Sequence, residues 1–311
     1  MDIHYRPLLL LPLLAAALSY GQPAVEPVGK PYALPIEGVY VAPRFSPGGD
    51  QLALSTPQYR GIYLYSFASG TLRELTAEPA AGFGLAWSPD GNWIAARPAK
   101  FENRRRYNTL VIIQVNTGEQ RQLTPFQTTL PGIPNWTSDG NFIFLDRTSN
   151  FQLYAIDPTV KPDTGVTLLF ARGKRIYQRD LLGREEQPLL TVAGEILNMV
   201  PNPQRTRVAY EILGGHLWIL DLNTNKTYDL GPGNEPVWHP EGDKLAFMTT
   251  RDDGHQITEA DIYVVNSDGS GRMKLTDTPT VLEMRPTWSP NGKMIVYDTD
   301  GWGPIMVQEI R

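Results

Sequence analysis

The stretch W-S-P-D-G-N-W-I-A, Trp87 to Ala95, decides the fold of this chain, because variants of it recur along the sequence. Each copy runs in one order: an aromatic residue, then Ser, Thr or His, then Pro or Ser, an acidic or small residue, Gly and a short apolar run. A repeat of about forty residues with β character is typical of the blades of a β-propeller. The further copies are Phe45–Leu54, Trp136–Phe144, Trp238–Phe247 and Trp288–Tyr297, with a degenerate sixth at Pro201–Tyr210.

The residues of this phrase have physical reasons to form a tight turn. Pro89 fixes φ near the value that the first corner needs, and Gly91 supplies the positive φ that closes the turn. An apolar strand follows each turn, and a later hairpin ends in Leu-Thr, as at Leu75–Thr76 and Leu123–Thr124. Each repeat therefore predicts four strands, and the chain predicts an all-β fold, a closed β-propeller.

The spacing of the copies leaves two blade counts open. The gap from Thr137 to Asn202 is 65 residues, long for one blade, and Pro158–Phe170 within it loosely matches Pro286–Tyr297. A seventh blade starting there would leave about two dozen residues for the third, too few for four strands of about five residues with their turns. We therefore favour six four-stranded blades, the third with an insertion, over seven.

The last repeat, Arg285–Arg311, holds only three strands' worth of chain. A closed ring needs a fourth strand, and the segment Pro31–Val41 at the other end of the chain is available to supply it. Ring closure also removes the exposed sheet edges that favour aggregation. We expect an N-terminal strand to complete the last blade.

The repeats resemble those of the TolB-like β-propellers over roughly Val41 to Arg311. The passage that carries the resemblance best is Thr249–Gly254, Ile262–Gly269 and Lys274–Thr276, with its polar loop, I-Y-apolar strand and Leu-Thr hairpin end. The resemblance implies the type of blade. It is less specific for function, since related blades also occur beside peptidase domains and in some polysaccharide lyases. The α/β domain ahead of the propeller in the family's namesake is not expected, because about twenty residues separate the N-terminal apolar segment from the first blade.

The first residues predict export. The apolar run Pro7–Leu18 is too short to span a bilayer and has the length of a signal-peptide core. Small residues allow cleavage after Ser19 or Gly21. We divide the chain into a signal peptide at 1–21, a linker at 22–30 and a TolB-like propeller domain at 31–311. A periplasmic or secreted protein follows, without stable membrane insertion after cleavage.

Composition narrows the classes of function. The 311 residues carry a net charge of −5 and contain no cysteine. This charge gives no field that would attract nucleic acid, so no nucleic-acid partner is expected. The missing cysteines exclude disulfides, thiolate metal sites, a cysteine nucleophile and a lipid-modified N-terminal Cys. We expect a monomer.

The sequence holds few groups that carry chemistry. It has no G-x-S-x-G nucleophile motif, no P-loop and no dinucleotide fingerprint. Of the three histidines after the signal segment, His216, His239 and His255, the second occupies the Ser position of a turn and is interpreted as a turn residue. His255 lies in the predicted loop Arg251–Ala260 and is grouped with Asp252, Asp253, Glu259 and Asp261, which could hold a hard cation but lack the spacing of a calcium loop. We expect no catalytic residue, no metal and no cofactor.

Binding through the channel is better supported. The inner strands of a propeller begin at one end of the channel. We call the Ser, Thr, Asn or His position of each phrase its Ser-equivalent. The residues four positions before each Ser-equivalent should then ring the mouth of the channel. Glu235 and Arg285 fall on neighbouring blades, where we expect a structural ion pair, and Arg44 adds a further charge. The predicted ring is Ala42, Gly84, Ile133, Asn198, Glu235 and Arg285.

Loops between second and third strands should rim the same face. They add Arg104, Arg105, Tyr107, Arg251 and Trp302 as candidate partner-binding residues, because Arg and aromatic side chains anchor many interfaces. A solvated basic loop is the alternative for Arg104–Tyr107. The Trp residues at one repeat position should instead pack between blades; they are Trp87, Trp136, Trp238 and Trp288.

The sequence thus predicts an exported, noncatalytic scaffold that binds an envelope protein or peptide through its channel face. The alternatives are a hydrolase or lyase with a site assembled from rim loops, and a propeller that binds a small molecule or sugar. A compact cluster of carboxylates and histidine in the channel would favour an enzyme. Paired charges would favour the scaffold.

Overall fold

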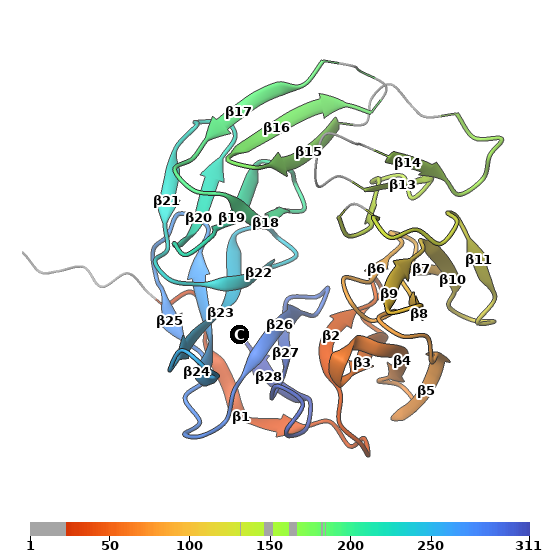
Figure 1. Cartoon of the computed structure of the whole chain (residues 1–311). Coiled ribbons are helices and arrows are strands. Elements are labelled where there is room, and N and C mark those ends of the chain that lie inside the picture. Colours follow the sequence, from red (N-terminus) through yellow and green to blue (C-terminus); the bar gives the residue numbers. More distant parts are fainter. Residues whose placement is uncertain (1–22, 131, 146–151, 162–166, 182, 184) are drawn as a thin grey trace, which may run out of the picture.

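The computed structural model describes residues 23–311 except 131, 146–151, 162–166, 182 and 184. Seven antiparallel sheets of three or four strands follow one another around a ring, and an eighth, two-stranded sheet projects from it (Figure 1). The helical content of the described residues is one 3-10 turn, η1 at Pro57–Tyr59. The all-β propeller predicted from the sequence is confirmed.

We number the blades from the first inner strand. Blade 1 contains β2 (Val41–Phe45), β3 (Gln51–Thr56), β4 (Arg60–Ser66) and β5 (Thr71–Thr76). Blade 2 contains β6 (Ala86–Trp87), β7 (Trp93–Ala96), β10 (Val111–Gln114) and β11 (Gln120–Gln122). The projecting hairpin of β8 (Ala99–Glu102) and β9 (Arg105–Asn108) is inserted between β7 and β10. Blade 3 contains β12 (Asn135–Trp136), β13 (Phe142–Leu145) and β14 (Gln152–Ala155).

The remaining blades complete the ring. Blade 4 contains β15 (Thr167–Arg172), β16 (Arg175–Asp180) and β17 (Gln187–Thr191). Blade 5 contains β18 (Ile196–Pro201), β19 (Arg207–Ile212), β20 (Leu217–Asp221) and β21 (Thr227–Asp229). Blade 6 contains β22 (Asn234–Trp238), β23 (Lys244–Asp252), β24 (Ile257–Asn266) and β25 (Met273–Lys274). Blade 7 contains β26 (Met284–Trp288), β27 (Met294–Asp298), β28 (Met306–Ile310) and β1 (Pro27–Ala33).

The blade count is seven, the alternative that the sequence left open, rather than the favoured six. The argument for six assumed four strands in every blade, whereas blades 3 and 4 have three each among the described residues. In blade 4 the three described strands correspond to the second, third and fourth of a full blade. The turn between β15 and β16 lies at the start of β18, where the Ile196 amide donates to the Gly173 carbonyl (2.8 Å), so β15 runs in the direction of a second strand. The six phrases of the sequence therefore mark the six inner strands.

The N-terminal strand closes the ring as predicted. β1 pairs antiparallel with β28, from Pro27 opposite Ile310 to Ala33 opposite Met306. Its bounds differ from the expected Pro31–Val41, because the second half of that segment crosses to blade 1 and its last residue opens β2. The strand also takes residues 27–30 from the segment interpreted as a linker. The predicted signal peptide, residues 1–21, lies outside the described residues.

The core forms between blades. The buried apolar residues make seven clusters, and each cluster takes its members from two consecutive blades, including blades 7 and 1. Alternate residues of one strand serve opposite clusters: Leu52 and Leu54 of β3 pack toward blade 7, and Ala53 packs toward blade 2. Successive side chains of a strand point to opposite faces of the sheet, so they enter different clusters when both faces are covered.

The repeated Trp residues join neighbouring blades, as predicted. The indole N–H of three of them donates to an inner-strand carbonyl of the preceding blade: Trp87 to Arg44 (3.2 Å), Trp136 to Ala86 (2.9 Å) and Trp238 to Val200 (2.8 Å). Trp288 packs edge-on against His239, with ring centroids 4.8 Å apart.

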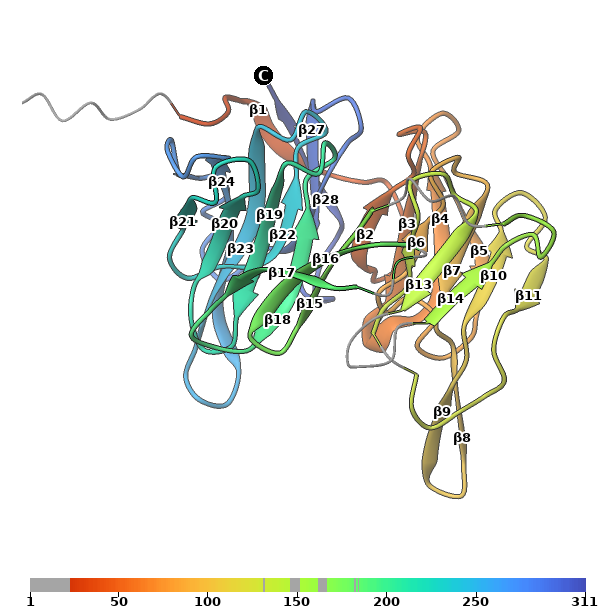
Figure 2. The ribbon, with the colours of Figure 1, turned by 90° about the horizontal axis from the view of Figure 1, so that it is seen from above.

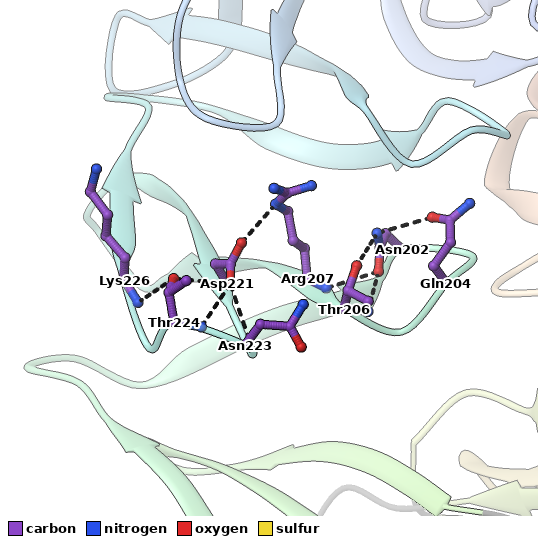
Figure 3. Close-up of polar contacts among 8 residues, drawn as sticks. All are labelled: Asn202, Gln204, Thr206, Arg207, Asp221, Asn223, Thr224 and Lys226. Carbon is purple, nitrogen blue, oxygen red and sulfur yellow. Dashed lines mark hydrogen bonds and ion pairs between the residues drawn. The ribbon is translucent and has the colours of Figure 1, made fainter.

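The phrases themselves lie at one end of the channel, which we call the turn face. The Ser88 hydroxyl accepts the amide of Trp93 across the turn (2.9 Å). In the degenerate copy, the Asn202 side chain takes this role and accepts the amides of Thr206 (2.8 Å) and Arg207 (2.9 Å) (Figure 3). The opposite end, where inner strands begin, is the mouth face.

Candidate functional site

The mouth face is built on a repeated β-bulge. The ladders between first and second strands shift register at its start in blades 1, 5, 6 and 7. Ala42, Glu235 and Arg285 occupy equivalent positions there with φ of 55°, 52° and 52°, and Gly84 has φ 61°. A left-handed conformation costs a non-glycine residue about 1–2 kcal/mol, so the surroundings must hold it. A bulge also changes the direction of the side chains that follow it.

Two buried carboxylates hold these bulges across the blade boundaries. Asp298, at the end of β27, accepts the Ala42 amide of the next blade (2.8 Å). Glu211, one residue before the end of β19, accepts the Glu235 amide of the next blade (2.7 Å). Sequence analysis missed both acids. Their signal was an acid that ends an apolar strand run, in V-A-Y-E at Val208–Glu211 and I-V-Y-D at Ile295–Asp298.

The expected ion pair between Glu235 and Arg285 is wrong. The Arg285 guanidinium instead donates to Asp298 through Nε (2.7 Å) and a terminal nitrogen (2.6 Å), and to Asp300 (2.9 Å). Burial lowers the pKa of Arg285, but its hydrogen bonds with Asp298 and Asp300 outweigh burial and hold that pKa above its ordinary value. Glu235 pairs with Arg44 at 3.5 Å, and both side chains remain partly exposed.

Glu211 is the second buried acid described at the mouth. It is buried, and burial raises its pKa to about 7; the nearby charge of Glu235 acts in the same direction. The Asn198 side-chain amide donates to the same oxygen that accepts the Glu235 amide (3.1 Å). These contacts account for Glu211 as a structural group between blades 5 and 6.

Apolar exposure is concentrated on the mouth face. Nine large apolar residues are exposed among those described, and two of them, Val28 and Tyr32, lie on the outer strand β1. The other seven lie in the segments of the mouth face, and Trp302, 87% exposed, is the most accessible. Those seven are Val39, Phe83, Phe101, Ile133, Leu197, Leu213 and Trp302.

Tyr59 connects the apolar and charged parts of this face. Its ring meets that of Phe83 edge-on at 5.2 Å. Burial raises the pKa of the Tyr59 hydroxyl, and the charges of Arg285 and Glu235 also act on it. Tyr59 therefore lies near the Arg44–Glu235 and Arg285–Asp298 pairs, with a partly exposed ring.

Two predicted rim loops are β-hairpins, so the expectation of loops is wrong. Arg104, Arg105 and Tyr107 lie on the β8–β9 hairpin, whose two-residue turn, Asn103–Arg104, has φ of 49° and 61°. Positive φ at both positions is the geometry of a type I′ turn, and the Asn was its signal. Arg251 lies where β23 extends beyond the blade, paired with Glu259 at 3.3 Å. Both hairpins project from the same side of the ring (Figure 2).

The described residues offer one group that could approach a metal ion, His239, Glu241 and Asp243, with ligand atoms within 4.8 Å of one another. It lies on the turn face. His239 Nδ1 faces Asp243 at 2.9 Å, and Lys244 also pairs with that carboxylate, which opposes a cation. His239 is a turn residue here, as predicted. In the β23–β24 hairpin, the Asp253 carboxylate accepts the amides of His255 and Gln256 and so stabilises the turn.

The histidines are also far apart in the fold. His216 contacts Asp229 beside β20, His239 lies on the turn face and His255 lies at the tip of the β23–β24 hairpin. Among the described residues no histidine hydrogen-bonds to a Ser, Thr or Tyr hydroxyl. The mouth holds paired charges and apolar side chains.

The comparisons with known proteins concern the fold. No protein-family model matches the chain. A stretch of 107 residues is 29% identical to the "Uncharacterized peptidase YuxL" of Bacillus subtilis (strain 168), covering 30% of this chain and 16% of that protein. No helix among residues 23–311, as far as they are described, is long and apolar enough to cross a membrane.

Solved structures of TolB proteins share the fold. TolB from Acinetobacter baumannii aligns with a TM-score of 0.55 at 18% identity, over 80% of this chain and 57% of that one. A putative TolB from Agrobacterium tumefaciens aligns with a TM-score of 0.55 at 18% identity, over 90% of this chain and 96% of that one. With its seven blades and the closing N-terminal strand, the chain has the fold of a TolB-like β-propeller.

Proposed function

We propose that this chain is an exported, noncatalytic scaffold that binds a protein or peptide of the cell envelope through its mouth face. The observation that carries the proposal is the position of the exposed apolar residues, seven of nine on that face. Exposed apolar groups beside polar ones are typical of protein-binding surfaces. The apolar run at Pro7–Leu18 and the TolB-like fold support a periplasmic site of action.

The charges of the mouth favour binding over catalysis. Asp298 accepts four hydrogen bonds: two from the Arg285 guanidinium, one from the Ala42 amide and one from the Asp300 amide. Glu211 accepts two. A general acid or base needs a free proton position within reach of a substrate. The 107-residue similarity to a peptidase covers too little of that protein to transfer an activity.

The test is capture of envelope proteins with the full chain and with a mouth variant, Trp302→Ala with Phe83→Ala. Both side chains are exposed, so their removal should leave the fold intact. Arg285 is unsuitable for this purpose because its removal would leave Asp298 buried without its cation. The matched control is Tyr32→Ala, an exposed aromatic residue on the outer strand β1.

We expect one envelope protein to be retained by the parent and by the control, and to bind the mouth variant at least about ten-fold more weakly, as for hot-spot aromatic residues. Equal retention by all three proteins would place the site elsewhere. Absence of any specific partner would contradict the proposal.

A further inference from the structure

The β8–β9 hairpin, which we call the basic arm, differs from the rest of the surface in charge. Its ten residues, Ala99–Asn108, contain four cations, Lys100, Arg104, Arg105 and Arg106, and one carboxylate. The protein as a whole carries a net charge of −5. The arm also exposes Phe101, 67% accessible and opposite Arg106 in the ladder.

The basic arm has an ordered framework. Lys100 pairs with Glu102 at 2.9 Å and lies over the ring of Phe126, 4.6 Å from its centroid, which ties the base of the arm to the chain that follows blade 2. The Gln127 amide donates to the Asn108 carbonyl (2.9 Å), and the Asn108 amide donates back (2.8 Å). Four pairs of residues and a type I′ turn complete the hairpin.

Two of its outermost cations have no hydrogen bond or ion pair within the described part of the chain. The Arg106 side chain donates to Asn108 (3.0 Å). Arg104 and Arg105 are exposed and make no hydrogen bond or ion pair with any residue that the structure describes. Arg guanidinium groups beside an aromatic ring suit carboxylates and aromatic side chains, through charged hydrogen bonds and cation–π contact.

The second hairpin, β23–β24 beyond the blade, has the opposite charge and projects from the same side of the ring (Figure 2). It carries Asp252, Asp253 and Glu259 against one cation, Arg251. A flat anionic membrane that met both hairpins would be attracted to one and repelled by the other. A protein partner can present a different charge to each. The pair of hairpins therefore favours a protein over a lipid surface.

We infer that the basic arm is a docking element for an acidic segment of the protein partner, with Arg104, Arg105 and Phe101 as its contacts. The inference rests on the proposed function and adds the chemistry of the partner: carboxylates facing blade 2, beside the apolar surface of the mouth. The acidic hairpin of blade 6 then disfavours the reversed orientation, because like charges across an interface are costly.

The experiment uses the full chain and a labelled peptide of alternating glutamate and tyrosine, with a lysine and tyrosine peptide as its counterpart. Fluorescence anisotropy measures binding at low and at physiological salt. The test variant is Arg104→Glu with Arg105→Glu. The control, Lys226→Glu with Lys293→Glu, makes the same change of net charge at exposed positions of the turn face. Vesicles of phosphatidylglycerol, tested by sedimentation, represent the membrane.

We expect the acidic peptide to bind the parent, more weakly as salt rises, and the arm variant at least about ten-fold more weakly, with the control within about two-fold. Equal losses in both variants, or no binding by the parent, would overturn the inference. Sedimentation of the parent with vesicles that the arm variant abolishes would replace the protein partner with a membrane. An envelope partner lost in the mouth variant but retained by the arm variant would leave the proposed function standing and refute the basic arm.

Discussion

Replacing Glu211 by Gln should change how the stability of the propeller depends on pH. Glu211 is 8% exposed, and its folded-state pKa of about 7 lies above the ordinary 4.5 because burial disfavours the charged form. The folded protein therefore binds this proton more tightly than the unfolded chain does. The stability that this proton provides is complete below pH 4.5 and is lost as pH rises toward 7.

The magnitude follows from the shift. The pKa of Glu211 rises from 4.5 to about 7, and each pKa unit corresponds to about 1.4 kcal/mol. Ionisation of Glu211 therefore lowers the free energy of unfolding by about 3 kcal/mol in all. About 2.5 kcal/mol of this loss falls between pH 5 and pH 8. Gln cannot ionise, but its oxygen can still accept the amides of Glu235 and Asn198. The variant should therefore lose about 2.5 kcal/mol less than the parent between these pH values.

Urea denaturation followed by Trp fluorescence at several pH values between 5 and 8 gives the measurement. The comparison of slopes matters, since a constant difference between the two proteins only reports the packing of the amide. Glu119→Gln, on the exposed β10–β11 hairpin, is the control and should follow the parent. Parallel pH profiles for the parent and the Glu211 variant would refute the burial argument.

Four further predictions test the architecture. Asp298→Ala should cost about 3 kcal/mol of stability in denaturation, because it leaves the half-buried Arg285 with Asp300 as its remaining acid and leaves the Ala42 amide without its acceptor. Trp136→Phe should lose about 1 kcal/mol through its indole hydrogen bond in addition to the lost ring packing, whereas Trp288→Phe should lose packing alone, since the Trp288 indole nitrogen is buried without a partner in the described structure. Deleting residues 23–33 should open the ring between blades 7 and 1 and promote association, visible in light scattering, because it exposes the edge of β28. Replacing residues 100–107 by a short Gly-Asn-Gly link should leave the unfolding midpoint within about 2–4 °C, because this hairpin lies outside the blade clusters.

The repeat made most of the fold predictable. The turn phrase depends on local chemistry: a hydroxyl or amide that accepts amides across the turn, and a Gly with positive φ, as at Ser88 and Gly91. The apolar residues on both faces of each strand then require that both faces of the sheet are buried, and neighbouring blades bury them. Blade 4 was only the less favoured alternative in the sequence, at Pro158–Phe170, because the phrase marks inner strands and the described part of that blade begins with its second strand, β15.

The site was less predictable, because its contacts cross from one blade to another. Counting back from the Ser-equivalents correctly located Arg285 and Glu235 at the mouth, but a position in the repeat does not tell which neighbour a long side chain meets. Arg285 turns to the acids of its own blade, and the Glu235 side chain meets Arg44 across the channel end. The basic arm was seen as a patch and interpreted as a loop, although Asn103 is a favoured turn residue between two pairing strands.

The two ends of the channel differ in how closely their segments pack against one another. On the turn face, neighbouring turns touch: a Cβ added at Gly49 would lie 3.2 Å from the Pro290 ring, so each phrase limits the next. On the mouth face the chain varies freely between blades, with a hairpin inserted after β7, an extended one after β23 and an exposed Trp302 after β27. Segments that the ring does not need can change without unfolding it, and these same segments carry the exposed apolar and unpaired basic side chains. A partner-binding role for the mouth face is therefore compatible with a fold whose stability comes from the blade interfaces.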